Sequence, residues 1–445
     1  MNSSSQILDA DALLAQAQAR TGLNDWGDPT LPERFGLAVE FLKSRNMDEA
    51  GQRAGADTCL WLLSSRLQFF EDFKRHPIGE ERIVQPLFAT GEPRSGTTLL
   101  HALLSVDPKA RALRFWEVMY PSPPPGVYGP EDPRSARADA DWREINTKMA
   151  FWLKSHPYND MLGNGLPQDE RTWAFDFRVM TPTAWWRVPF GMNVGGLPAE
   201  AFAQYRIHKM MLQQFQFKRP KRYWVLKGFH GQRLPEFFAT YPDAKMIWVH
   251  RDPVQAVASR IVLTGELVEG LTGKVDWAEQ ARIQLAMCRA GFKNTLENPS
   301  VMDPRIHHVR YPDFIGDPVG TIRGFYEKYG VPFGADTEAA MRAYLKNNKG
   351  DRYGKFVDIH LRTEISRGQR WRGRFPIDAQ NVASSIHHCN DHGVGIRGQR
   401  GCLHQRGNVG SREALRTSGG NCRSQRPYDA SAAGEVGTQN NRESE

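Results

Sequence analysis

Apolar side chains between residues 9 and 80 recur every three or four positions, the spacing that places them on one face of a helix. Phe35, Val39 and Leu42 form one such face, and residues 59–73 form a further stretch. The pattern therefore predicts a helical N-terminal region that comprises residues 1–80.

From residue 84 onward, short apolar runs alternate with segments of helical spacing. This alternation is typical of a parallel sheet whose strands are joined by helical crossovers. The predicted strands are 84–90, 223–227, 245–250 and 306–310. We therefore expect an α/β fold, a P-loop-like parallel sheet flanked by helices and preceded by a helical region, with the α/β domain at residues 81–355.

The interval from 121 to 220 begins with several prolines and is predicted to contain helices at 142–154 and 170–178. It is rich in aromatic side chains, which belong more often to a core than to a binding site. Because the interval lies between two segments with candidate chemistry, we expect part of it to line an apolar site. The aromatic residues are Trp152, Tyr158, Trp173, Phe175, Phe177, Trp185, Trp186 and Phe190.

The composition changes beyond residue 375, where lysine and nearly all aromatic residues disappear and no helical or strand period continues. Residues 356–445 are predicted to form a disordered tail, and a shifted reading frame near residue 356 would produce such a change. The histidines and cysteines of the tail match no zinc-ligand spacing, so no metal site is predicted: His387, His388, Cys389, His392, Cys402 and His404.

Composition and charge restrict the class of protein further. With 40% hydrophobic and 24% charged residues, the 445-residue chain has the composition of an ordinary globular protein. The net charge of +8 is not concentrated in Lys and Arg runs, which favours an anionic ligand over nucleic acid. Neither a signal peptide nor a membrane span is expected, and the five cysteines form no disulfide framework, so we expect a cytoplasmic location. The sequence does not indicate an oligomeric state.

The segment GEPRSGTT, residues 91–98, has the pattern of an anion-binding loop between a strand and a helix. Such a loop directs backbone N–H groups and the positive end of the helix dipole at one point. The lysine of an ATP-binding P-loop is replaced by Thr97, which argues for a phosphate ligand other than metal-bound ATP. The candidate binding residues are Arg94, Ser95, Gly96, Thr97 and Thr98.

Two further segments carry cations at the ends of predicted strands. Lys227 ends the strand at 223–227, and Arg251 follows the strand at 245–250. Ser259 lies eight residues after Arg251, about two helical turns further, and therefore on the same side of the helix. An arginine and a hydroxyl held in this way can bind one further phosphate.

Three segments resemble, in order, the blocks that bind the nucleotide in sulfotransferases that use 3′-phosphoadenosine 5′-phosphosulfate (PAPS): GEPRSGTT, VLKGFH and WVHRDPVQAVAS. The loop with PRSGTT is similar to that of the protein-tyrosine sulfotransferases and of a broad bacterial group. The likeness covers roughly residues 10–355. It implies an enzyme that transfers a sulfuryl group from PAPS, without a metal, to a hydroxyl of a small molecule or a glycan.

The resemblance also implies roles for single residues. Arg94 and Lys227 are expected to stabilise the charge that builds on the oxygen between sulfur and the 5′-phosphate. Tyr311 resembles the tyrosine after the last strand that touches the nucleotide. The acceptor hydroxyl needs a base, and in the protein-tyrosine type this is a glutamate at the place of Glu117.

The sequence contains a second candidate for the base and a pair of acids whose role is undecided. His230 lies three residues after Lys227, whereas the cytosolic sulfotransferases have a histidine two residues after the lysine, so His230 is the second candidate base or a substrate contact. Asp169 and Glu170 are interpreted as caps at a helix N-terminus.

Two other classes of function also stay open. A P-loop kinase or NTPase is one, with Asp252 imitating a Walker B acid, although the missing P-loop lysine counts against it. The other is an inactive nucleotide-binding protein, because the sequence after Gly354–Lys355 does not resemble the C-terminal part of the bacterial enzymes.

Overall fold

The structure is a computed structural model, and it describes ten stretches of the chain. The predicted tail, residues 356–445, lies outside the described residues, as do Trp152, Trp185, Trp186 and Phe190. The described stretches are residues 7–44, 47–129, 132–148, 153, 157–177, 179–180, 192–193, 201–219, 223–272 and 274–348.

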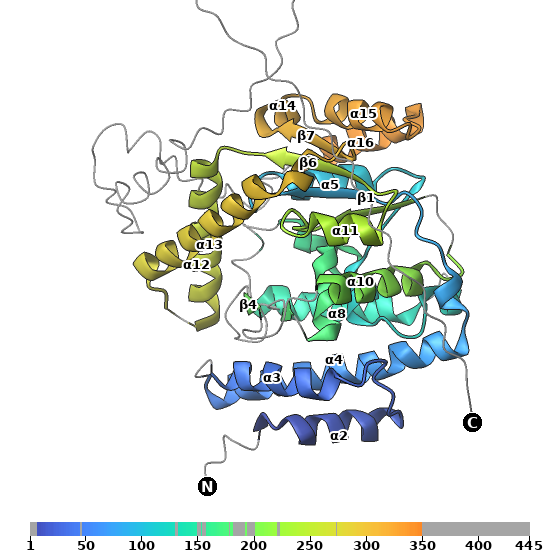
Figure 1. Cartoon of the computed structure of the whole chain (residues 1–445), viewed down its shortest axis with the longest axis vertical. Helices are drawn as coiled ribbons and strands as arrows, with labels where there is room; N and C mark the ends of the chain where they lie inside the picture. Colours follow the sequence, from blue (N-terminus) through green and yellow to red (C-terminus); the bar gives the residue numbers. More distant parts are fainter. Residues whose placement is uncertain are drawn as a thin grey trace, which may run out of the picture. The chain divides into compact units, whose positions relative to one another are not determined.

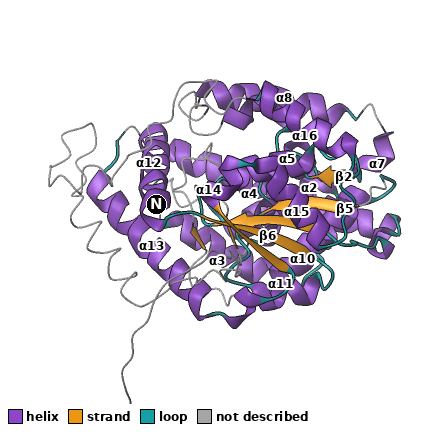
Figure 2. Cartoon of the chain, turned by 90° about the horizontal axis from the view of Figure 1, so that it is seen from above, coloured by secondary structure: helices purple, strands orange, loops and turns teal. Residues whose placement is uncertain are grey.

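In the described part of the chain, five parallel strands form the central sheet, in the order β2-β5-β1-β6-β7. Figure 2 shows this sheet with β2, β5 and β6 labelled. The four predicted strands are confirmed, with the first beginning three residues later than expected. The fifth, β2, was not predicted, and among the described strands it pairs only with β5. The strands are β1 (Leu87–Gly91), β2 (Ala110–Ala112), β5 (Tyr223–Lys227), β6 (Lys245–His250) and β7 (Ile306–Arg310).

Strand β1 occupies the centre of the sheet, between β5 and β6, and all of its residues are buried. Its successive side chains point to opposite faces. Phe88 therefore belongs to one hydrophobic cluster, while Leu87 and Ala89 belong to another on the other face. This burial on both faces explains the continuous apolar run that predicts the strand.

Helices cover both faces of the sheet (Figures 1 and 2). The cluster around Leu87 and Ala89 contains side chains of α5 (Thr97–Ser105), α15 (Pro318–Lys328) and α16 (Ala335–Asn347). The cluster around Phe88 contains side chains of α10 (Ala201–Gln216), of α11 (Leu234–Thr240) and of the N-terminal helices.

The N-terminal region is helical, as predicted. Its helices are α2 (Ala10–Thr21), α3 (Leu31–Lys43) and α4 (Glu49–Arg75). Asp9 and Asp48 cap α2 and α4 by accepting hydrogen bonds from the backbone N–H groups of Ala12 and Gly51. Side chains of these helices and of the sheet belong to one hydrophobic core, which marks no boundary between the two regions. The predicted domain boundary at residue 80 therefore stays a prediction.

The remaining elements lie between or after the strands. The helix expected at 142–154 begins earlier, at Pro133, and the one expected at 170–178 is a 3₁₀ helix, η4. Trp173, Phe175 and Phe177 pack in the core. The elements are η1 (Ile78–Glu80), α6 (Phe115–Met119), α7 (Pro125–Tyr128), α8 (Pro133–Lys148), η3 (Pro157–Asn164), η4 (Asp169–Asp176), β3 (Val179–Met180), β4 (Met192–Asn193), α12 (Pro253–Thr272), α13 (Trp277–Glu297), η6 (Pro299–Met302) and α14 (Tyr311–Gly316).

None of the helices in the described ranges combines the length and the apolarity that a bilayer crossing requires. The described cysteines, Cys59 and Cys288, are free and buried.

A buried cluster of charges ties the N-terminal helices to η4. The Asp176 carboxylate accepts from Arg34 Nη2 at 2.9 Å and from Arg66 Nη1 at 3.2 Å, and all three side chains are buried. Burial lowers the pKa of Arg66 to about 10, although the charge of Asp176 opposes that shift. The carboxylate therefore compensates two guanidinium groups that have little access to water.

We predict that Asp176→Asn lowers the free energy of unfolding by about 3–5 kcal/mol, because breaking a buried ion pair leaves a buried charge uncompensated. Urea unfolding followed by tryptophan fluorescence measures the change. Asp313→Asn is the matched control: Asp313 is paired with Arg310 in an exposed position, where an ion pair contributes little. Equal midpoints for the two variants would contradict the prediction.

Candidate functional site

The turn between β1 and α5 has the backbone geometry of an anion-binding loop. Gly96 ends the turn at φ 86°, a left-handed conformation that glycine adopts without strain, and α5 begins at the next residue. The first amides of α5 and the positive end of its dipole therefore face the loop. Within the described part of the chain, the buried hydroxyl of Ser95 has no hydrogen-bond partner.

Arg94 connects this loop to the segment that follows β6. Its backbone has φ 72°, which costs a residue with a side chain about 1–2 kcal/mol. Arg94 Nε donates to Ser259 Oγ at 3.0 Å, and the Arg94 carbonyl accepts from Arg251 Nη1 at 2.8 Å. The surroundings thus hold a strained conformation, as is common at functional sites.

Tyr311 completes the same group of residues. It begins α14 directly after β7, and its ring centroid lies 4.6 Å from the Arg251 guanidinium carbon. A Cβ atom added to Gly96 would lie 3.0 Å from Tyr311 Cε2, so this ring packs against the end of the loop. The structure therefore brings Gly96, Arg251, Ser259 and Tyr311 together, from three strand ends of the sheet.

Lys227 reaches the loop from the neighbouring strand β5. Its Nζ donates to Thr98 Oγ1 at 3.4 Å, and the side chain is buried. Burial lowers the pKa of Lys227 to about 8, while the charges of Glu170 and Asp169 act in the opposite direction. Lys227 thus brings a positive charge to the first turn of α5.

His230 is fully buried, and both of its ring nitrogens contact protein groups. Nδ1 lies 2.9 Å from the hydroxyl of Tyr205, and Nε2 lies 3.2 Å from the Asp169 carboxylate. Burial disfavours a charge on His230, but the charge and the hydrogen bond of Asp169 outweigh it and raise the pKa. Burial likewise opposes ionisation of Asp169, yet His230 holds the pKa of this carboxyl below its usual value.

The interpretation of Asp169 and Glu170 as helix caps is wrong. Asp169 faces His230, and Glu170 Oε1 accepts from the backbone N–H of Phe229 at 2.6 Å. A Cβ atom at Gly228 would collide with the Asp169 carboxylate and the His230 ring, so a larger residue would have to displace these side chains. The two acids lie about sixty residues before their partners in sequence, and no local pattern indicates the contact.

Glu117 lies on α6, which follows the edge strand β2, and its carboxylate is buried. Oε1 accepts from Arg111 Nη2 at 2.5 Å and from Arg219 Nη1 at 3.2 Å. Oε2 accepts from the backbone N–H of Arg114 at 3.0 Å. Both oxygens of the predicted base thus bind protein donors. None of the contacts between described residues joins Glu117 to Lys227 or to the loop.

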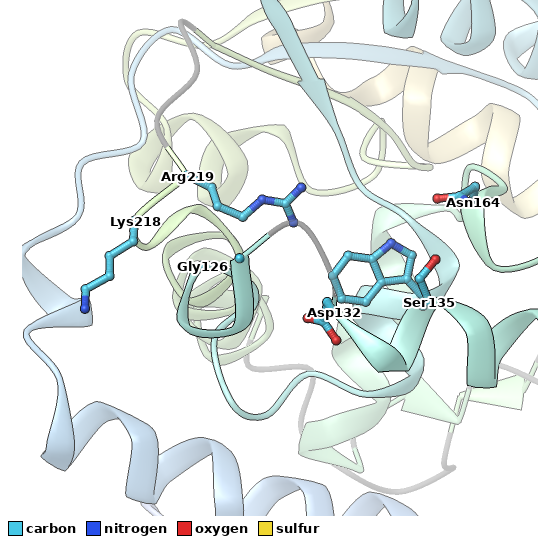
Figure 3. A pocket seen from close by; sticks show the side chains of 8 residues that line it. Gly126, Asp132, Ser135, Asn164, Lys218 and Arg219 are labelled. Carbon is cyan, nitrogen blue, oxygen red and sulfur yellow. The ribbon is translucent and has the colours of Figure 1, made fainter.

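A cavity of about 490 Å³ is lined by Arg219, a partner of Glu117, and its lining is about equally polar and apolar (Figure 3). Arg219 extends toward the middle of the lining residues, whereas Lys218 points away from them. Four charged or amide side chains are among the lining residues, so the cavity is not the apolar site expected in residues 121–220, which stays a prediction. The lining residues are Trp116, Gly126, Gly129, Asp132, Ser135, Asn164, Lys218 and Arg219.

We predict that Asp169→Asn destabilises the protein in a pH-dependent manner. Because the folded pKa of His230 is raised, its contribution is fully present below pH 6.5 and is lost as the pH rises through the raised value. The contribution of Asp169, whose pKa is lowered, is present above pH 3.8 and is lost on acidification. The free energy of unfolding should therefore fall by about 3–5 kcal/mol between these values and by less at about pH 9. Urea unfolding between pH 3.8 and pH 6.5, and again at about pH 9, measures the two losses of stability. Equal losses under the two conditions would contradict the prediction.

Comparisons with known proteins relate this arrangement to one family. Residues 86–335 match the family model described as the sulfotransferase family. The chain is 28% identical over 267 residues to the omega-hydroxy-beta-dihydromenaquinone-9 sulfotransferase Stf3 of Mycobacterium bovis and of Mycobacterium tuberculosis. The match covers 55% of this chain, and the chain spans 63% of the length of these curated relatives.

Two solved structures have the same fold. The sulfotransferase STF9 from Mycobacterium avium matches with a TM-score of 0.71 and 25% identity, over 87% of this chain and 97% of that one. The sulfotransferase STF1 from Mycobacterium tuberculosis H37Rv matches with a TM-score of 0.64 and 22% identity, over 85% of this chain and 98% of that one.

Proposed function

Because this chain belongs to the sulfotransferase family, we propose that it transfers a sulfuryl group from PAPS to a hydroxyl group of a small-molecule acceptor. One observation carries the proposal: Arg251 and Ser259 contact Arg94 of the anion-binding loop. The catalytic domain in this proposal is residues 81–355, preceded by the helical region 1–80.

Two anionic ends of the donor match two groups of residues. The loop amides, Ser95 and Thr98 bind the 5′-phosphosulfate at the N-terminus of α5, where the helix dipole favours an anion. Arg251 and Ser259, with the ring of Tyr311 beside them, bind the 3′-phosphate. A donor without a triphosphate needs no bridging cation, in agreement with Thr97 in place of the P-loop lysine.

The transfer is an in-line displacement at sulfur, and charge stabilisation supplies much of the catalysis. The acceptor oxygen forms a bond to sulfur while the bond from sulfur to the 5′-phosphate oxygen breaks, and the electron pair stays on that oxygen. Arg94 and Lys227 stabilise the charge that develops there. With a pKa of about 8, Lys227 is largely an ammonium ion at neutral pH.

A curated relative indicates the acceptor, and two cysteines indicate the location. The relative Stf3 is named for an ω-hydroxylated dihydromenaquinone, which makes an apolar prenyl alcohol the first acceptor to try. The free thiols of Cys59 and Cys288 support a reducing, cytoplasmic location.

We predict that the protein binds adenosine 3′,5′-bisphosphate in preference to Mg-ATP, because its loop lacks the lysine that contacts a triphosphate. Arg251→Ala should weaken bisphosphate binding by at least about tenfold, since one charge-assisted contact contributes roughly 1.5–3 kcal/mol. The same variant should leave the affinity for adenosine 5′-monophosphate nearly unchanged. Isothermal titration calorimetry measures the affinities for the bisphosphate, for Mg-ATP and for the monophosphate. A preference for Mg-ATP would overturn the proposed function in favour of a kinase or NTPase.

We predict that Arg94→Ala lowers turnover by about two to three orders of magnitude, because one donor to the developing charge lowers the barrier by roughly 3 kcal/mol. Transfer of ³⁵S-labelled sulfate from PAPS to farnesol, 1-dodecanol, 4-nitrophenol and cellobiose measures turnover. Arg310→Ala is the control, because Arg310 is exposed and pairs with Asp313. Bisphosphate binding by the wild-type chain without transfer to any acceptor would favour an inactive binding protein.

A further inference from the structure

The proposed reaction needs a group that removes the proton of the acceptor hydroxyl, and both candidates from the sequence are engaged elsewhere. The Glu117 carboxylate binds Arg111 and Arg219 through one oxygen and the backbone of Arg114 through the other. His230 uses one nitrogen for Tyr205 and the other for Asp169, and it has no exposed surface. Neither side chain presents a free acceptor atom to a substrate.

Glu170 lies at the same strand end as Lys227. Its Oε1 accepts from the N–H of Phe229, two residues after Lys227, at 2.6 Å. Lys227 Nζ in turn donates to Thr98 Oγ1 at the start of α5. Among the described residues this is the one hydrogen bond of the Glu170 carboxylate, so Oε2 has a lone pair available for a proton. A carboxylate is therefore held next to the cation that faces the anion-binding loop.

The charges around Glu170 leave it as the carboxylate suited to accept a proton. Asp169 is compensated by His230, whereas Glu170 has no ion pair of its own in the described ranges. Burial raises the pKa of Glu170 to about 7; His230 and Lys227 oppose this shift, and Asp169 adds to it. Arg171, the next residue along the chain, is half-buried; burial lowers its pKa to about 10, and the charge of Glu170 opposes this shift. A base with a pKa near the working pH is the most effective one.

We propose that Glu170 is the general base of the sulfuryl transfer, an inference that rests on the proposed function. The Glu170 carboxylate takes the proton of the acceptor hydroxyl as its oxygen bonds to sulfur. The bond between sulfur and the bridging oxygen breaks, and its electron pair remains on the 5′-phosphate, stabilised by Lys227. The products are the sulfate ester, adenosine 3′,5′-bisphosphate and a protonated Glu170, which releases its proton to solvent.

We predict that Glu170→Gln lowers kcat by about two to four orders of magnitude, the usual contribution of a general base. The glutamine oxygen can still accept from Phe229, so bisphosphate affinity should stay within about twofold of the wild type. In the wild type, kcat should rise as the pH increases through about 7, where Glu170 ionises, and fall above about 8, where Lys227 loses its proton. The variant should lack the rise, and Glu170→Asp should retain part of the activity together with it.

The measurements use labelled sulfate transfer to farnesol, or to whichever of the four acceptors the wild type sulfates fastest, and bisphosphate titration as the test of folding. Glu117→Gln is the matched comparison. If Glu170→Gln binds bisphosphate and keeps wild-type kcat, or if the wild type lacks the acidic rise, the inference is wrong. Loss of the acidic rise in Glu117→Gln alone would return the role to Glu117. A wild-type chain that sulfates none of the acceptors would instead refute the proposed function, and this inference with it.

Discussion

The parallel pairing of β1 with β5 on one side and β6 on the other is the constraint on which the candidate site depends. In a parallel sheet all strands end at the same edge, and ligands bind there where the strand order reverses. The loop after β1, Lys227 at the end of β5 and Arg251 after β6 therefore meet, although up to 157 residues separate them. An antiparallel neighbour would have carried one of these groups to the opposite edge.

Several buried carboxylates of the described residues have an opposite charge beside them. The carboxylates of Asp169, Asp176 and Glu117 each face a histidine or arginine side chain. Burying such groups is costly in a medium of low polarity, and their partners offset that cost. Glu170 and Lys227 have perturbed pKa values instead. Burial raises the pKa of Glu170 to about 7 and lowers that of Lys227 to about 8, so both values lie close to neutrality. Groups of this kind are able to exchange protons under ordinary conditions.

Sequence patterns predicted the elements that carry a strong local signal. The buried strands at the centre of the sheet are continuous apolar runs, and the N-terminal helices have a clear apolar face. Strand β2 was missed because its three residues, Ala-Arg-Ala, have little preference for a strand and pair only once β5 is in place. The start of α8 was missed because its first turns, from Pro133, are mostly polar.

The sequence alone determined the fold class, the family resemblance and the residues of the loop, because each of these depends on neighbours within a short segment. The tertiary structure decided the contacts of Glu117, of His230 and of the pair Asp169 and Glu170. In a sequence, an aspartate or glutamate is the same residue whether it caps a helix, pairs with an arginine or faces a buried lysine. Its burial and its charged neighbours determine its chemistry, and distant parts of the chain supply both.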